Sequence, residues 1–420
     1  MASTSTLTRA QLRLFVFLGV ASFFEGYDFL ALSQVLAKLR EEMSLSEADA
    51  GWLVAFTNAG TVVAYLLVRK ADRWGRRKLL NLTIFGYATF SFLTGLSWDA
   101  WSFAGFQFVA RIFLIGEGVI AMVYAAEEFP AERRGMVIGV ILAMASFGSI
   151  VCAGVVPLLV KVQLTSPITG DPLGWRLVYF VGVVPLLLLG YARRNLAETR
   201  RFAESGAAGR ARQPLGAIWR TPYARRVVQL AVIWGLAYIC NQNAVTFFKD
   251  YAIHELGLTE KEIGGMVAIA ALIAMPMVFA VGPMMDRIGR KRGAAVVFLL
   301  GAAGVLGSFT LTDKWMINAS MVLAIFGASA FLPVLTAFTT ELFPTELRGD
   351  AFAWANNLLG RLTYVLSPIA LGTIAETHGW GPTLAVTTVG PVLALILVFA
   401  WMPETTGKEL EETAALGAGH

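Results

Sequence analysis

Apolar stretches of about 20 residues follow one another along almost the whole chain, and short polar segments separate them. A stretch of this length crosses about 30 Å of hydrocarbon as an α-helix. We place twelve such helices at 12–37, 48–69, 78–97, 102–124, 136–160, 176–192, 226–248, 262–283, 293–312, 316–339, 351–374 and 382–402. Runs of short alternating segments, the signature of a transmembrane β-barrel, are not evident. The pattern therefore predicts an all-α membrane protein with 12 transmembrane helices.

The composition and the charge distribution support this prediction and orient the helices. Only 15% of the 420 residues are charged, against about 25% in soluble proteins. Most of the 34 Lys and Arg fall in the N-terminus, the loops from even to odd helices, the central segment and the C-terminal tail. The opposite face carries Lys38, Arg40, Lys161, Arg176, Lys249, Lys261 and Lys314. The positive-inside rule then predicts that both termini are cytoplasmic. The net charge of +5 is thus a signal of orientation, and we exclude a nucleic-acid partner.

The sequence argues against an enzyme, a metal site and a cofactor. Cys152 and Cys240 fall within predicted helices and form neither a disulfide framework nor a metal-binding spacing. No nucleophile–base pair and no glycine-rich phosphate loop is evident. Residues 9–24 are similar to a signal peptide, but the apolar run continues to Leu36 without a cleavage site. We therefore expect an uncleaved first span.

An internal repeat divides the chain into two halves. "DRWGRRK" at 72–78 recurs as "DRIGRKR" at 286–292, and "EEFPAERRG" at 127–135 recurs as "ELFPTELRG" at 341–349. Both repeats are displaced by the same number of residues, which one chance match would not explain. Each half holds an even number of helices, so the two six-helix repeats are parallel in the membrane. We predict an N-terminal bundle at 1–192, a cytoplasmic linker at 193–224, a C-terminal bundle at 225–402 and a cytoplasmic tail at 403–420.

Two parallel six-helix repeats are typical of secondary transporters whose substrate binds between the repeats. With its two "DRxGR" loops, the chain resembles the major facilitator superfamily over essentially its whole length, and "PETTGKELEE" at 403–412 is similar to the C-terminal signature of sugar porters and organic-ion transporters. The resemblance implies the major facilitator fold and a multi-pass protein of the cell membrane, here a bacterial inner membrane. It also implies a small-molecule substrate, protons and the lipid bilayer as partners, and we expect a monomer.

The resemblance further implies a cytoplasmic gate of ion pairs that latches the cytoplasmic ends of the helices when the carrier faces outward. Its residues would be Asp72, Arg76, Glu128, Arg134 and Glu198 in the first half, and Asp286, Arg290, Glu341, Arg348 and Glu404 in the second. The alternative is that these charges only fix the topology.

The first helix carries two acidic residues, Glu25 and Asp28, in "FFEGYDFLALSQVL" at 23–36. A carboxylate at bilayer depth costs about 2.5–3.5 kcal/mol on insertion scales. Three residues apart, the two share a helix face, and neighbouring carboxylates resist double ionisation, so one can exchange a proton near neutral pH. "EGYD" also resembles the D-G-x-D stretch of aromatic-acid:proton symporters, with Glu25 in place of the first Asp. We expect both to couple protons; alternatively, one pairs with an intramembrane Arg or caps a helix break at Gly26.

Two further charged residues lie in the predicted fourth helix. Arg111 is similar to the buried Arg that the superfamily has there, and Glu117 is a third intramembrane carboxylate. Six residues separate the two, so they lie on different faces and their direct pairing within the helix is doubtful. Either residue could serve proton transfer or structure, and we include both as candidate proton-coupling residues.

The repeat also points to candidate substrate contacts. The position equivalent to Asp28 is Gln242, within "CNQN" at 240–243. Asn241, Gln242 and Asn243 are costly in a membrane unless they face protein or water, so we expect at least one, Gln242 first, to face the substrate. Hydrogen bonding between helices is the alternative. We also include Tyr27, which lies between the first-helix carboxylates, as a substrate contact.

The predicted eleventh helix supplies the remaining candidates in "WANNLLGRLTY" at 354–364. At α-helical spacing, one stripe would contain Trp354, Asn357, Arg361 and Tyr364. An Arg binds carboxylates in bidentate fashion, and the rings can stack on a planar acid. The alternative is that Arg361 bridges to another helix.

These observations favour a proton-coupled symporter that imports a small organic anion, an aromatic or other carboxylate, by alternating access. A sugar, organic-cation or drug transporter of the same superfamily is the first alternative. "NAVTFF" at 243–248 is only a faint counterpart of the sugar-porter pattern, whose preceding glutamines are missing. A non-transporting membrane receptor on this fold is the second alternative.

Overall fold

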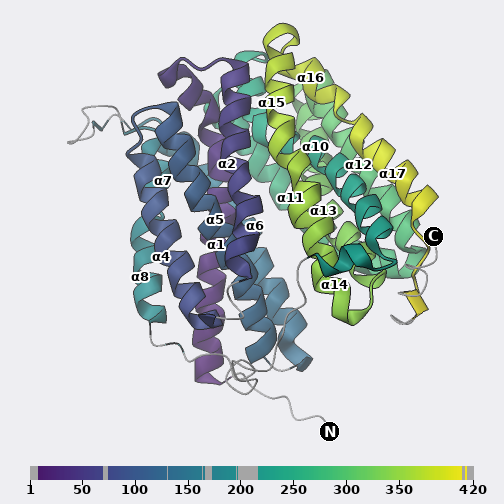
Figure 1. Ribbon diagram of the computed structural model, residues 1–420. Helices are drawn as coiled ribbons and strands as arrows, with labels where there is room; N and C mark the ends of the chain where they lie inside the picture. The colour runs from purple at the N-terminus through teal and green to yellow at the C-terminus, as the bar shows by residue number, and fades with distance from the viewer. Residues whose placement is uncertain are drawn as a thin grey trace. The chain divides into compact units, whose positions relative to one another are not determined.

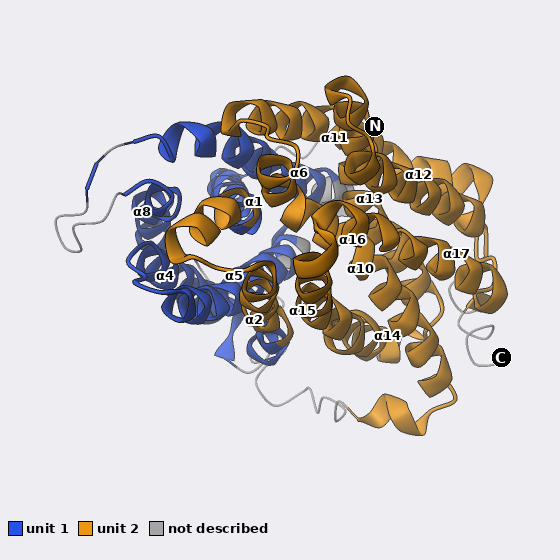
Figure 2. Cartoon of the chain, turned by 90° about the horizontal axis from the view of Figure 1, so that it is seen from above, with its two compact units in different colours: residues 1–32, 63–211 blue, residues 33–62, 212–420 orange. Residues whose placement is uncertain are grey.

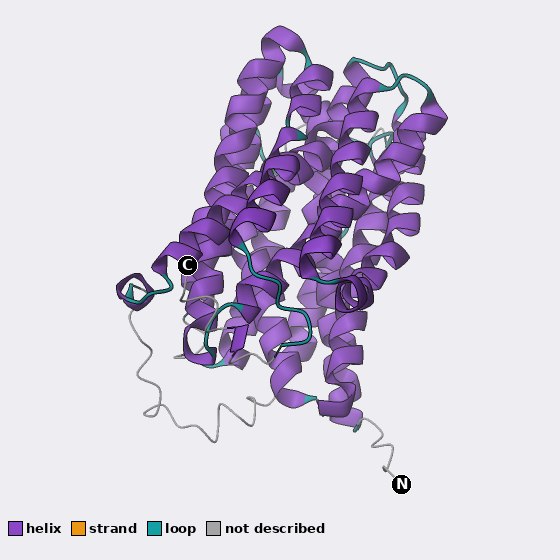
Figure 3. Ribbon diagram, turned by 90° about the vertical axis from the view of Figure 1, so that its right-hand side faces the viewer, coloured by secondary structure: helices purple, strands orange, loops and turns teal. Residues whose placement is uncertain are grey.

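The computed structural model describes residues 8–69, 74–129, 131–162, 164–165, 173–194, 196, 216–408 and 412–413, and these ranges are helical almost throughout (Figure 1). The first half contains α1 (Arg9–Met43), α2 (Glu47–Val68), α4 (Arg76–Gly95), α5 (Ala100–Glu128), α6 (Ala131–Leu159), α7 (Arg176–Phe180) and α8 (Val183–Arg193). The short 3₁₀ turn η1 (Ala217–Arg220) precedes the second half. Short loops join most of these helices (Figure 3).

The second half repeats the pattern of six membrane-spanning segments. It contains α10 (Ala224–His254), α11 (Glu260–Ile288), α12 (Arg290–Thr310), α13 (Lys314–Glu341), α14 (Thr345–Phe352), the π-helical segment η2 (Ala353–Gly360), α15 (Arg361–His378), α16 (Trp380–Val386) and α17 (Val389–Trp401). Among the described residues, 11 helical segments are long and apolar enough to cross a membrane. The 20-residue helix α4 is the twelfth. The prediction of an all-α protein with 12 membrane helices is confirmed.

Side-chain caps explain where several helices begin. Asp99 accepts a hydrogen bond from the Ser102 backbone at 2.7 Å at the start of α5, and these bonds hold the pKa of the exposed Asp99 carboxyl below its usual range. Thr259 and Glu262 form a capping box at the start of α11, and Asp313 caps α13. Because such a cap satisfies backbone N–H groups that have no helical partner, these residues fix where the loops before α5, α11 and α13 end.

The helices form two compact units, which Figure 2 shows in different colours. Unit 1 contains residues 1–32 and 63–211, and unit 2 contains residues 33–62 and 212–420. The last part of α1 and the first part of α2 thus pack with the second half of the sequence. The predicted boundaries at 192, 224 and 402 remain predictions, although α8 continues to Arg193.

Unit 1 is held together by a close crossing of α1 and α6. A Cβ atom added to Gly26 would lie 1.7 Å from the carbonyl oxygen of Ala145, and one added to Gly148 would lie 1.8 Å from that of Phe23. Small residues allow such close approach of helices in membranes. Gly26 therefore serves helix packing, and α1 continues through it without a break, so the alternative of a carboxylate capping a helix break does not hold.

Unit 2 has a core of aromatic and aliphatic side chains from α10, α12, α13 and α17. The Trp234 and Phe331 rings meet at 5.9 Å, and Tyr238 packs edge-on against Phe331 at 5.4 Å. Next to this core, α12 and α13 cross closely at Gly301 and Gly327. The core fixes the face of α10 that bears Tyr238, which the candidate site uses.

Candidate functional site

Asp28 and Arg111 form the centre of a buried polar cluster in unit 1. Asp28 is 3% exposed and Arg111 is 2% exposed. The Asp28 carboxylate faces the Tyr87 and Ser91 side chains of α4 and interacts with the charge of Arg111 on α5. The guanidinium carbon of Arg111 lies 5.2 Å from the centre of the Phe29 ring. Among the described residues, Asp28 and Arg111 make no direct ion pair, so their attraction acts across a gap.

Several polar atoms in this cluster lack a protein partner within the described part of the chain. They are Oδ2 of Asp28, Nε and Nη1 of Arg111, and the hydroxyls of Tyr27 and Tyr179. Both tyrosines interact electrostatically with Asp28. Buried polar groups are almost always satisfied by protein, water or ligand, so water or a polar ligand would satisfy these atoms. Tyr179 was not predicted, because a Tyr near a helix end also fits ordinary membrane anchoring.

The other two predicted proton-coupling residues lie close to each other in the same unit. The Glu25 carboxylate packs over Gly118, where an added Cβ would approach Oε1 to 2.3 Å, and its charge interacts with that of Glu117. Glu117 forms an ion pair with Arg193 of α8 and accepts a hydrogen bond from the Thr83 hydroxyl at 2.6 Å. Glu117 therefore pairs with Arg193 and not with Arg111, in agreement with the predicted difference in face.

A second cluster surrounds Arg361 in unit 2. Tyr238 of α10 lies near Arg361, whose charge acts on the Tyr238 hydroxyl, and the Tyr238 and Tyr364 rings lie 5.6 Å apart. Nη1 of Arg361 also donates to the Thr61 carbonyl oxygen at 3.4 Å, from the part of α2 that belongs to this unit. The cluster thus holds a half-buried guanidinium beside two phenol rings, a combination that suits a carboxylate on a flat molecule.

The predicted stripe on the eleventh helix assumed α-helical spacing throughout, and the structure differs there. Residues 353–360 form a π-helical segment immediately before Arg361, and such segments occur frequently at functional sites. In the π-helical segment, Asn356 and not Asn357 accepts a hydrogen bond from the Tyr238 hydroxyl at 2.8 Å. Trp354 packs edge-on against Trp219 of η1 at 5.1 Å. Arg361 and Tyr364 remain together, whereas Trp354 lies against the segment before α10.

The three polar residues of "CNQN" have different environments. Asn241 donates to the Ala237 carbonyl oxygen at 3.0 Å, and Asn243 donates to the Ser367 hydroxyl at 2.7 Å, which joins α10 to α15. Both side chains are buried, but only Asn243 makes the hydrogen bond between helices that was given as the alternative, because the Asn241 bond lies within α10. Gln242 is half-buried, and its side chain has no hydrogen bond to a described residue. It lies one helical turn after Tyr238, so it shares the face that bears the Arg361 cluster.

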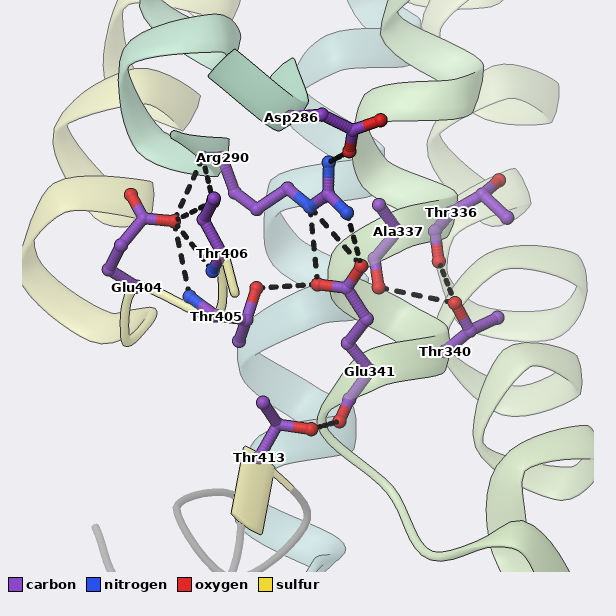
Figure 4. A network of polar contacts seen from close by, with 10 residues as sticks. All are labelled: Asp286, Arg290, Thr336, Ala337, Thr340, Glu341, Glu404, Thr405, Thr406 and Thr413. Carbon is purple, nitrogen blue, oxygen red and sulfur yellow. Dashed lines mark hydrogen bonds and ion pairs between the residues drawn. The ribbon is translucent and has the colours of Figure 1, made fainter. Parts of the chain in front are cut away.

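The gate predicted for the second half is assembled around Arg290 (Figure 4). Its guanidinium pairs with Asp286 at 2.7 Å and with Glu341 at 3.0 Å. Glu404 accepts hydrogen bonds from the backbone N–H groups of Arg290 at 2.8 Å and Lys291 at 3.1 Å. Because these bonds satisfy the first turn of α12, Glu404 acts as its N-terminal cap.

The surroundings of Glu404 also set its acidity. Partial burial raises its pKa, but the bonds from the Thr406 hydroxyl and from the Lys291, Arg290 and Thr406 amides outweigh burial, so the pKa lies below its usual value. Arg348 donates instead to the Phe343 carbonyl oxygen at 3.4 Å. Among the described residues no ion pair joins Arg348 to Glu341 or Glu404.

The gate predicted for the first half is described only in part. Asp72 and Glu198 lie outside the described residues, as does the side chain of Arg134. Arg76 is buried at the start of α4, and the Glu128 carbonyl oxygen accepts a hydrogen bond from Gln11 at 3.0 Å. The network of the first half therefore stays a prediction.

A group of buried ion pairs at the predicted outer end was not anticipated from the sequence. Arg40 of α1 pairs with Asp250 of α10 and with Glu47 of α2 at 2.5 Å, and Asp250 is fully buried. His254 lies 3.2 Å from the same Asp250 carboxylate. Charge counting had placed Arg40 in a loop, whereas the helix continues past it. The adjacent charges of Lys249 and Asp250 after an apolar run were the available signal.

Lys249 extends this group, and Gly51 of α2 packs closely against α15 in the same unit. The Lys249 ammonium pairs with Glu260 of α11 at 2.5 Å and donates to the Gln34 carbonyl oxygen of α1. An added Cβ on Gly51 of α2 would lie 2.3 Å from the Pro368 carbonyl oxygen of α15. Within unit 2, the ends of α1 and α2 are therefore fastened to α10, α11 and α15.

Comparisons with known proteins agree with this architecture. A putative metabolite transport protein of Haemophilus influenzae is 25% identical over 401 residues, which cover 92% of this chain and 95% of that protein. The cis,cis-muconate transport protein of Acinetobacter baylyi is 27% identical over 378 residues, covering 86% and 87% of the two proteins.

Solved structures share the fold. The inward-open xylose transporter XylE from E. coli matches with a TM-score of 0.74 at 21% identity, covering 96% of this chain and 99% of that one. A bacterial homologue of the human lysosomal transporter Spinster matches with a TM-score of 0.79 at 15% identity, covering 98% and 99%. The family description "Major Facilitator Superfamily" matches residues 18–248 and 230–418, and the chain therefore belongs to the major facilitator superfamily of transporters.

Proposed function

We propose that this transporter is a proton-coupled symporter that imports a small organic carboxylate by alternating access, with both termini in the cytoplasm. The observation that carries the proposal is the buried Asp28 carboxylate, which faces Arg111 without a closed ion pair and has an oxygen free of protein partners among the described residues. Three relatives are named as transporters of muconate, niacin and sialic acid, and each of these compounds carries a carboxylate.

Proton binding at Asp28 changes the charge of the unit 1 cluster. The ionised carboxylate is attracted to Arg111, and this attraction is strong because both groups are buried. A proton on Asp28 removes the attraction and leaves one net positive charge in the cluster. Because a buried charge without its partner is costly, the two protonation states of Asp28 differ in how favourable an occluded cluster is. Protonation can therefore set which access state is favoured.

The substrate carboxylate binds at Arg361 in unit 2. The guanidinium offers paired N–H donors, and the Tyr238 and Tyr364 rings beside it provide flat apolar surface. Gln242 and Asn357, both half-buried and without a hydrogen-bond partner among the described residues, supply further donors and acceptors. This arrangement favours a planar or unsaturated acid over a neutral sugar, since a partly desolvated guanidinium gains more from an anion than from a neutral hydroxyl.

Alternating access requires that one end of the transporter opens as the other closes. Two buried ion pairs, Arg40–Asp250 and Lys249–Glu260, join helices at the predicted outer end within unit 2. At the predicted cytoplasmic end, the Arg290 network lies within the second half (Figure 4). We infer that the outer pairs separate when the carrier opens outward, and that the gate at the other end then forms contacts across the halves.

The test is uptake by the purified protein in liposomes, screened across aromatic acids, aliphatic acids and sugars, with and without an inward proton gradient. Asp28→Asn should abolish accumulation driven by the gradient and leave exchange of labelled for unlabelled substrate intact. Glu376→Gln, which changes an exposed carboxylate in α15, is the matched control. Unchanged accumulation by Asp28→Asn would reject the assignment.

A second variant tests the substrate class. Arg361→Ala should weaken uptake of a carboxylate by about tenfold or more, because a charge-assisted bidentate contact contributes about 1.5–3 kcal/mol. Arg220→Ala, which removes an exposed guanidinium, is the control. If Arg361→Ala reduces uptake of an acid and a neutral sugar equally, Arg361 is structural and the anion proposal fails.

A further inference from the structure

Arg193 is a buried cation that the proposed mechanism does not yet use. It closes the last turn of α8, and its side chain is fully buried. Nη1 pairs with Glu117, and Nη2 donates to the Phe17 carbonyl oxygen of α1 at 2.5 Å. The cost of burying a guanidinium is offset only by good partners, and an Arg does not lose its proton in proteins. The pair therefore places a permanent positive charge directly against the Glu117 carboxylate.

Glu25 has the opposite environment. It is half-buried, and the described residues give its carboxylate neither a hydrogen bond nor an ion pair. It packs against the backbone of α5 at Gly118, immediately after Glu117. Glu25 also lies three residues before Asp28, which is about 4.5 Å along the helix axis, on the side of the predicted cytoplasmic end of α1. Glu25 thus lies between Asp28 and that end, with no hydrogen bond to a described residue holding its carboxylate.

The groups that face Glu25 come from its own helix and from the helices packed against it. Asp28 follows it on α1, Glu117 faces it from α5, and the Tyr87 hydroxyl on α4 interacts with both Glu25 and Asp28. Helix α6 meets this part of α1 through the backbone at Ala145 and Gly148, which have no titratable group. Among the described residues, Glu117 is the charged group whose field acts on Glu25.

We propose that Arg193 holds Glu117 as a fixed anion, which makes Glu25 the second proton-carrying carboxyl on the path from Asp28 to the predicted cytoplasmic end. This inference rests on the proposed proton-coupled function. The proton leaves the Asp28 carboxyl and binds a Glu25 oxygen, so Asp28 becomes an anion facing Arg111 and Glu25 becomes neutral. Glu25 later releases the proton toward the cytoplasm and regains its charge. Arg193 is a positioning residue in this scheme, because it acts through Glu117.

The alternative is that the Arg193–Glu117 pair only fastens α8 to α5. The two roles differ in how uptake depends on pH. If fixed negative charge at Glu117 draws the proton to Glu25, Glu117→Gln should move the pH midpoint of uptake to lower pH by about one unit or more. Arg193→Gln should move it to higher pH, because two carboxyls without a cation share one proton. Arg193→Lys should keep the midpoint. A simple fastening role predicts the same midpoint in all variants.

The experiment measures initial uptake by the purified variants in liposomes as a function of pH, together with substrate exchange at equal pH and thermal stability. Opposite midpoint shifts for Glu117→Gln and Arg193→Gln, with exchange kept within about threefold, are the expected result. Thr83→Val gives a milder variant if these fold poorly. It removes the 2.6 Å hydrogen bond that stabilises the Glu117 anion, so like Arg193→Gln it should shift the midpoint to higher pH, but by a smaller amount.

The inference is overturned if the midpoints stay within about 0.2 units of the unmodified protein while exchange and stability fall together. Asp28→Asn separates this failure from failure of the proposed function. If the unmodified protein shows no proton-driven accumulation at all, the symport proposal itself is wrong. If Asp28→Asn loses coupling but the midpoints of the Glu117 and Arg193 variants do not move, only the role of Arg193 is wrong.

Discussion

Loss of the Arg40 side chain should open the predicted outer end of the transporter. The Arg40 and Asp250 side chains are 9% and 0% exposed, so Arg40→Met leaves a buried carboxylate whose remaining ion-pair partner among the described residues is His254. Removing one partner of a buried pair costs about 3–5 kcal/mol. At the lower limit of this range, the ratio of outer-open to outer-closed protein rises by about 100-fold.

Partial changes should have smaller effects, and the structure ranks them. Asp250→Asn leaves Arg40 paired with Glu47 at 2.5 Å, so we expect a cost of about 1–3 kcal/mol. Replacing both members by apolar residues, as in the double variant Arg40→Met with Asp250→Leu, should restore most of the closed state. Lys38→Met is the control, because its pair with Glu41 is about half exposed and such pairs contribute about 0–1 kcal/mol.

The assay is alkylation of a cysteine at Ala37, which is fully buried one turn before Arg40. A membrane-impermeant maleimide is added from outside to protein in which the buried Cys152 and Cys240 are replaced by Ala. Arg40→Met should raise the alkylation rate by about 100-fold, while Lys38→Met changes it by less than about fivefold. Equal rates in these two variants would show that the buried pair does not close the outer end.

Three other consequences can be measured on the same protein. Gly51→Leu should slow transport by about tenfold or more and expose the Ala37 probe, because the new Cβ would lie 2.3 Å from the Pro368 carbonyl oxygen. Unchanged exposure of the probe would mean that α2 and α15 separate easily. Glu404→Gln should cost about 1 kcal/mol by weakening the cap of α12, with a lower melting temperature as the readout. Since the pKa of Glu404 is lowered in the folded protein, its stabilising contribution is present above the usual carboxyl range and is lost as the pH falls through the lowered value; a melting-temperature difference between Glu404→Gln and the unmodified protein that persists at low pH would contradict this.

The number and order of the helices were predictable from the sequence, because the length of an apolar run decides whether it can cross a membrane. The members of the second-half gate were also predictable in part: Asp286, Arg290 and Glu341 are in contact as expected. The repeat and the local motif specified these residues together. Glu404 joins them through the backbone N–H groups of α12, and Arg348 donates to the Phe343 carbonyl oxygen. Both of these contacts depend on the tertiary geometry.

Other features could not be predicted. Ideal helix spacing does not reveal a local π-helical segment, and counting charges does not reveal whether a basic residue at a helix end is buried. The π-helical segment before Arg361 moves Asn356 into the place expected for Asn357. No pattern of residues predicted this segment. Arg193 and Arg40 were counted as loop charges, yet both lie within helices and are buried in ion pairs. A basic residue at a helix end satisfies the positive-inside rule equally well when it is exposed and when it is paired.

The most direct test of the account measures proton and substrate movement together. Purified protein is reconstituted into liposomes that contain a pH-sensitive dye, and a labelled carboxylate substrate is added outside without an imposed gradient. The account predicts that the interior becomes acidic as the label enters, and that Asp28→Asn removes the acidification at equal substrate exchange. Entry of the label through the unmodified protein with no change of internal pH would contradict proton coupling.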